Sequence, residues 1–139
     1  MKITLLTVAA LLALTPAAFA ASEAFTADLK SASEVPANTS KGSGTLTATY
    51  DTASKKLTYT ATYKDLSGPA TMAHFHGPAD AKTNAPPVVP VKDMTPGTLK
   101  GEATLTDAQA ADLEAGKWYF NIHTAANKGG EIRGQVMKK

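Results

Sequence analysis

The chain of 139 residues contains no cysteine, which excludes disulfide bonds, zinc sites built on thiolates, iron–sulfur clusters and thiol nucleophiles. It also has no excess of charge of one sign, because 14 Lys and Arg residues stand against 12 Asp and Glu residues. A net charge of +2 does not supply the basic surface that nucleic-acid binding needs, so no nucleic-acid partner is expected. The length suits one domain. Histidine is scarce, with three residues in all, and their positions carry much of the functional argument.

The first twenty residues have the features of a secretory signal peptide. Lys2 is their only charge, an apolar run follows over 3–14, and Ala18-Phe19-Ala20 forms a small-residue exit. The apolar run is shorter than the ~20 residues that a comfortable membrane span requires, and no cysteine is available for a lipid anchor. We therefore expect cleavage after Ala20, a single domain over 21–139 without a membrane span, and a periplasmic or secreted location.

The rest of the chain predicts an all-β fold. Apolar residues alternate with threonines and other polar residues at a period of two, as in half-buried strands. Gly and Pro pairs separate the runs, which suggests an antiparallel Greek-key sandwich or barrel of about eight strands. The predicted strands are 25–29, 45–50, 57–63, 70–76, 88–91, 98–105, 117–123 and 131–137.

One segment is expected to be a short helix. Thr106 and Gln109 have the spacing of a capping box, 108–115 contains good helix formers, and Gly116 suits the C-terminal stop. Two stretches are expected to be loops, 36–44 and 77–87. The second is long and rich in proline, and long loops in compact domains are often functional.

The three histidines are candidates for a metal site. His74 and His76 share one face of the strand 70–76, whereas Phe75 points to the core from the other face. His123 ends the strand 117–123 on the face opposite its large apolar residues, so it becomes the third ligand if the two strands are neighbours. Three imidazoles without a thiolate suit copper or zinc, and copper binds more tightly. The alternative is that these histidines are solvated or only hydrogen-bonded.

Four other polar residues are candidates for supporting or structural roles. Glu34 is interpreted as part of a turn, with the alternative that its carboxylate fixes a loop or orients a histidine. Asn121 shares the face of His123. Glu131 and Arg133 share one strand face, where Arg is expected to form a bidentate ion pair with a partner strand. The alternative for Arg133 is the attraction of an anion to a nearby metal.

The ordered motifs resemble the CHRD domain, named after chordin. The resemblance rests on 25–29 with Glu-Val-Pro at 34–36, on Gly42-x-Gly44, on the run 73–79 (AHFHGPA), on 116–124 (GKWYFNIHT) and on 130–135 (GEIRGQ), so it extends over about 25–136. It implies a compact all-β domain of the kind found in free-standing exported bacterial proteins and in the extracellular repeats of chordin. The motif His-x-His-Gly and the later Asn-x-His are also distantly similar to the copper half of copper–zinc superoxide dismutase. No fourth histidine is present to bridge to a zinc ion, so a copper-only site is the version that this similarity leaves.

Two functional hypotheses follow from different classes. In the first, the chain is an exported CHRD-domain protein that binds a metal ion, copper before zinc, through His74, His76 and His123. Carriage, sequestration and redox chemistry of the superoxide dismutase type all remain open under it, so whether the chain is an enzyme is not decided. In the second, the chain is a non-catalytic module that binds an extracytoplasmic protein or envelope component, and its histidines are structural.

Overall fold

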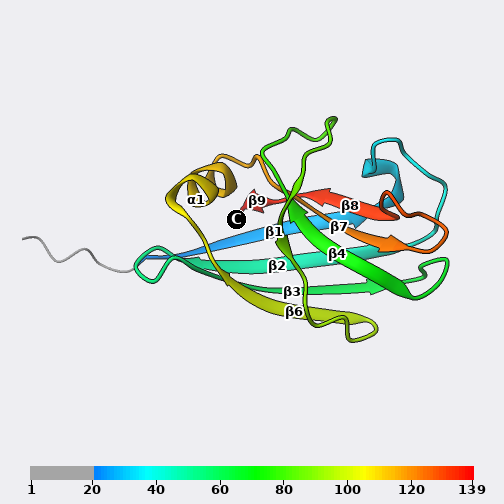
Figure 1. Ribbon diagram of the computed structural model, residues 1–139, viewed down its shortest axis with the longest axis horizontal. Coiled ribbons are helices and arrows are strands. Elements are labelled where there is room, and N and C mark those ends of the chain that lie inside the picture. The colour runs from blue at the N-terminus through cyan, green and yellow to red at the C-terminus, as the bar shows by residue number, and fades with distance from the viewer. Residues whose placement is uncertain (1–20) are drawn as a thin grey trace, which may run out of the picture.

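The computed structural model describes residues 21–139, so the predicted signal peptide lies outside the described residues. Strands are the main regular elements of residues 21–139, together with one α-helix and one turn of 3-10 helix (Figure 1). The strands are β1 (Ser22–Lys30), β2 (Ser43–Asp51), β3 (Lys56–Lys64), β4 (Ala70–His76), β5 (Pro87–Pro90), β6 (Thr98–Thr104), β7 (Tyr119–Thr124), β8 (Ile132–Gln135) and β9 (Met137–Lys138). The helices are η1 (Ser31–Ser33) and α1 (Asp107–Glu114).

The strands form one antiparallel sheet that nearly closes into a barrel. Their spatial order is β5-β4-β7-β8-β1-β2-β3-β6, and β9 extends the pairing of β1. A single bridge between Asp93 and Lys100 links the chain after β5 to β6 and brings the two ends of the order together. Strands β4, β5 and β6 follow one another, and β7 returns to pair with β4, which is a Greek key. The predicted fold class is confirmed.

The hairpin of β2 and β3 shows how the sequence pattern becomes this sheet. Leu46 pairs with Ala61 and Ala48 with Tyr59, and all four side chains are buried inside the barrel. The residues between them are threonines on the outer face, so the two-residue alternation matches the inside and outside of the sheet. The burial of one face fixes the register, because a slip by one residue would turn every apolar side chain outward.

The helix and the last strands refine the predicted boundaries. Thr106 accepts from the backbone of Gln109 and the Gln109 side chain accepts from Thr106, so the predicted capping box is present. The predicted strand 131–137 is wrong as one continuous element. Val136 is buried between β8 and β9, and its N–H donates to Trp118 O. Strand β8 lies between β7 and β1, whereas β9 pairs with β1 alone.

The barrel interior is aromatic beneath β4 and β7. Phe75, Trp118 and Phe120 are fully buried, and the Phe75 ring meets the Phe120 and Tyr59 rings edge to face with centroids 4.9 and 5.0 Å apart. Within residues 21–139 no helix is long and apolar enough to cross a membrane. The loop 77–86 leaves the end of β4 and returns to β5, at the top of the view in Figure 1.

Candidate metal centre

The three histidines come together on the outer side of two neighbouring strands. Met72 pairs with His123, His74 with Asn121 and His76 with Tyr119, so the histidines occupy one face of the β4–β7 ladder. One potential ligand atom from each ring lies within 4.8 Å of those of the other two. The closest pair is His74 Nδ1 and His123 Nε2, at 3.2 Å. The predicted neighbourhood of the two strands, and with it the clustering of the rings, is confirmed.

The cluster is more deeply covered than the strand pattern indicates. His76 and His123 retain 8% and 7% of their exposure, whereas His74 is half-buried. Every residue of β7 is buried, on both faces of the strand. The reason is that the loops 77–86 and 125–131 fold over the outer face, a placement that two-residue alternation cannot reveal. The site is therefore a recess with one accessible edge at His74.

Backbone carbonyls fix the protonated nitrogen of two of the rings. His76 Nδ1 lies 2.8 Å from Ala85 O, and His123 Nδ1 lies 2.8 Å from Lys128 O. A carbonyl oxygen only accepts, so each Nδ1 carries the hydrogen and donates it. In this tautomer each Nε2 carries a lone pair, which faces His74 Nδ1 at His123 and Asn121 Oδ1 at His76. An Nδ1–H that donates to a backbone carbonyl is the arrangement that metal-binding histidines show.

The surroundings favour the neutral rings. Burial lowers the pKa of His74, and the neighbouring His123 and His76 lower it further. Burial also lowers the pKa of His76, and this outweighs its hydrogen bonds to Ala85 and Asn121. A neutral imidazole is the form that binds a metal ion. Around neutral pH these two rings are thus ready to act as ligands.

Asn121 supplies a test of whether a cation fits here. It is 2% exposed, and its Oδ1 lies 2.9 Å from His76 Nε2. With the Nδ1 hydrogen given to Ala85, a neutral His76 ring has no hydrogen to donate to Asn121 Oδ1, so this contact is satisfied by a protonated ring, by an amide turned to present Nδ2, or by a cation at Nε2 that the amide oxygen then faces. The three imidazoles form a donor set suited to copper or zinc, and the amide oxygen lies beside it.

Tyr119 and Arg133 support the site from beneath the loop. The Tyr119 ring stacks on the His76 ring at a centroid distance of 4.7 Å, and the Arg133 guanidinium lies over its other face, 3.4 Å from the centroid. Arg133 donates to Asn84 Oδ1 at 2.9 Å and to the carbonyls of Asp80 and Thr83. The loop whose Ala85 carbonyl orients His76 is therefore held by this guanidinium.

The predicted ion pair of Arg133 is wrong. Within residues 21–139 no carboxylate lies within 4.0 Å of it, because its donors are occupied by loop carbonyls and by Asn84. It is also 1% exposed, and the alternative role, the attraction of an anion to a nearby metal, stays a prediction. Contacts to loop carbonyls cannot be recognised from a pattern of side chains. The position of Tyr119 on the same strand face as Asn121 and His123, in contrast, could have indicated that its ring lies at the site.

Glu131 fastens the loops on the other side of the cluster. Its fully buried carboxylate accepts from the hydroxyls of Ser40, Ser67 and Thr124, from the Ser67 backbone N–H and from Asn127 Nδ2. These hydrogen bonds outweigh its burial and lower the pKa of Glu131 to about 2. The predicted structural role is therefore found at Glu131, and it joins four separate segments of chain.

Glu34 is buried without touching a histidine. It is 5% exposed and its Oε1 has no hydrogen-bond partner, so burial raises the pKa of Glu34 to about 7 despite the nearby Arg133 and Asn121. It lines a hollow of about 530 Å³ together with Arg133. Gly130, at a φ of 128°, leaves room for it, because a Cβ there would overlap Glu34 Oε1. Glu34 therefore packs behind Asn121 and does not orient an imidazole directly.

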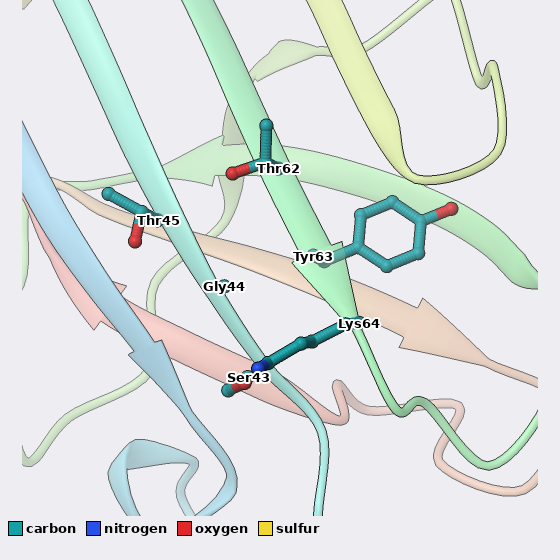
Figure 2. Close-up of a pocket in the computed structure, with 6 residues that line it drawn as sticks. All are labelled: Ser43, Gly44, Thr45, Thr62, Tyr63 and Lys64. Carbon is teal, nitrogen blue, oxygen red and sulfur yellow. The ribbon is translucent and has the colours of Figure 1, made fainter.

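A separate hollow of about 320 Å³ lies at one end of the β2–β3 hairpin (Figure 2). Gly44 is one of its lining residues, and the Tyr63 ring points away from it while Lys64 extends toward Ser43. Its lining contains no carboxylate and no imidazole, so it lacks metal ligands. The histidine cluster is the group of metal-ligating side chains that the described residues bring together.

Comparison with known proteins gives one match. Residues 25–136 match the family model described as CHRD domain. No match was found among the curated proteins. None was found among the solved structures either. The matched segment includes all three histidines and every residue of the supporting network described above.

Proposed function

The chain belongs to the CHRD family, and from this premise and the histidine cluster we propose that it is an exported protein that binds one copper ion through His74, His76 and His123. The observation that carries the proposal is the pair of carbonyls, Ala85 O and Lys128 O, that hold the Nδ1 hydrogens and so direct an Nε2 lone pair of each ring into the cluster. A merely solvated histidine has no need of such fixation.

Copper is proposed ahead of zinc for two reasons. The ligand set is nitrogen without thiolate, and on such a set copper is the tighter binder of the two. The apolar run and small-residue exit in 1–20 also support export, to a compartment where copper and oxidants are met. Bound there, copper supplies one-electron chemistry, and the chain supplies the three imidazoles, a covered recess and one accessible edge.

Copper titration of the purified protein tests the proposal. Because the chain has only three histidines, nitrogen couplings in the electron paramagnetic resonance spectrum of bound Cu(II) report this site alone. We expect one Cu(II) per chain, bound by imidazoles, and loss of that ion in His74→Ala, His76→Ala and His123→Ala. Lys64→Ala is the control, since Lys64 lies on the β2–β3 hairpin and touches none of the histidine network.

Four results separate the remaining hypotheses. A dismutase assay on the copper-loaded protein distinguishes catalysis from carriage or sequestration. Cell fractionation with N-terminal sequencing tests export and cleavage after Ala20. Stoichiometric copper binding that survives all three histidine substitutions overturns the proposal. Absence of copper binding, with partner capture unaffected by chelators, favours the alternative of a non-catalytic binding module with structural histidines.

A further inference from the structure

Met72 is an exposed apolar side chain beside the histidine cluster. It is 49% exposed, and within residues 21–139 the other large apolar side chain left in solvent is Met137, at 52%. Met72, His74 and His76 alternate along β4 and therefore share its outer face. A single exposed apolar residue is ordinary in a protein surface, so exposure alone says little about function. The register of the strands gives the exposure of Met72 a functional meaning.

A β-bulge places Met72 opposite His123. Ala70 pairs with Thr124 and Met72 with His123, so Thr71 is the extra residue between the two pairs. The Thr71 hydroxyl donates to His123 O at 3.2 Å, which ties the bulge to the same histidine. Directly opposed residues of an antiparallel pair have Cβ atoms ~4.5–5.5 Å apart. The thioether of Met72 therefore starts from a position next to the ring of His123, at the accessible edge of the recess.

The chemistry of a thioether adds what three imidazoles lack. Three protein ligands leave one position of a four-coordinate ion open. Thioether sulfur is a soft donor that selects Cu(I), whereas it contributes little to Zn(II). Methionine has three rotatable side-chain bonds and adapts to irregular surroundings. A methionine at the solvent edge can move onto a bound ion without disturbing the barrel.

We infer that Met72 is a fourth ligand of the site, which joins the three histidines when the ion is Cu(I) and makes the site selective for Cu(I) over Zn(II). The inference rests on the proposed copper-binding function and goes beyond it, because it assigns an oxidation state and a metal preference. A site that holds Cu(I) with sulfur and Cu(II) with nitrogen alone can receive or release the ion in its reduced form.

Met72→Leu tests the inference with the full chain. Leucine keeps the size and apolarity of methionine and removes the sulfur, so folding is preserved. The matched control is Met137→Leu, an equally exposed methionine on β9. Cu(I) affinity is measured without oxygen, with ascorbate present, by competition with the chelator bicinchoninate. Cu(II) and Zn(II) affinities are measured in parallel, and X-ray absorption of the Cu(I) protein reports whether sulfur is bound.

The expected result is a Cu(I) affinity about 10-fold weaker in Met72→Leu, which corresponds to about 1.4 kcal/mol. Cu(II) and Zn(II) affinities stay unchanged, a sulfur neighbour of Cu(I) disappears, and Met137→Leu behaves as the original protein does. Cu(I) bound by nitrogen alone in the original protein overturns the inference, as does an equal loss of Cu(I) and Cu(II) affinity. Both outcomes leave the three-histidine site standing. A protein that binds neither oxidation state contradicts the proposed function itself.

Discussion

The buried carboxylate of Glu131 offers a prediction whose magnitude follows from two separate observations. The perturbation is Glu131→Gln, which keeps the shape of the side chain and removes its charge. A pKa of about 2 in place of the ordinary 4.5 corresponds, at ~1.4 kcal/mol per pH unit, to about 3.5 kcal/mol of stabilisation by the ionised form at neutral pH.

The hydrogen bonds lead to a similar value. The carboxylate accepts three hydroxyls, one amide and one backbone N–H. Bonds to a charged acceptor contribute about 1 kcal/mol more than neutral ones, and they are not additive. The hydroxyls can reverse their roles toward a glutamine NH2 group, but the Ser67 N–H cannot. We therefore expect Glu131→Gln to lower the free energy of unfolding by about 2–3 kcal/mol at pH 7.

The assay is urea-induced unfolding followed by the fluorescence of Trp118, the only tryptophan of the chain and fully buried. Because the folded-state pKa of Glu131 is lowered, its contribution is complete above pH 4.5 and is lost as the pH falls through about 2. The difference between the two proteins should shrink to about half at pH 3. Glu102→Gln is the control, since the ion pair of Glu102 with Lys56 is exposed and contributes about 0.5 kcal/mol or less. A difference below about 1 kcal/mol at pH 7, or one that does not change with pH, refutes the reasoning.

Three further predictions concern the residues around the cluster. Glu34→Gln should match the original protein in stability at pH 4.5 but exceed it by about 3 kcal/mol at pH 8. The pKa of Glu34 is raised to about 7, so the stability of the original protein falls as the acid ionises between pH 4.5 and 7, and thermal melting at the two pH values checks this. Arg133→Lys keeps the charge but loses the planar guanidinium that binds Asn84 and the carbonyls of Asp80 and Thr83. We expect faster hydrogen exchange over 79–86 and Cu(II) binding weakened about 10-fold. Unchanged exchange contradicts the role of Arg133 in holding the loop. Gly130→Ala should lower the free energy of unfolding by about 2 kcal/mol or more, measured by urea unfolding. Its φ of 128° is strained for any residue with a side chain, and the new Cβ would overlap Glu34 Oε1. Gly129→Ala is the control, which should stay within about 1 kcal/mol because nothing lies within 4 Å of the new Cβ.

The elements that follow from a local sequence pattern, such as alternation in a strand or a helix cap, could be predicted from the sequence. Alternation in 45–50 and 57–63 gives β2 and β3, and Thr106 with Gln109 gives the start of α1. The same alternation places Phe75 inside the barrel and His74 and His76 outside it. The pairing of β4 with β7, on which the histidine cluster depends, required only that two predicted strands be neighbours.

The supporting parts of the site could not be predicted, because they depend on backbone atoms. Ala85 O and Lys128 O orient two histidines, yet any residue offers a carbonyl. Arg133 binds such carbonyls in the loop 77–86, so the expectation of an ion pair with a carboxylate was wrong. The bulge at Thr71 contains no glycine that could indicate it, and the break at Val136 between β8 and β9 falls within a run of alternating residues that predicts one strand.

The gap between β5 and β6, where the barrel does not fully close, has a consequence for aggregation at high protein concentration. In the described part of the chain, β5 and β6 end the order of strands, and so they offer backbone groups to which a foreign strand could add. Strand β5 runs Pro87-Val88-Val89-Pro90, so half of its residues have no amide hydrogen to donate. The two prolines of β5 therefore disfavour the edge-to-edge aggregation of copies of this cysteine-free protein.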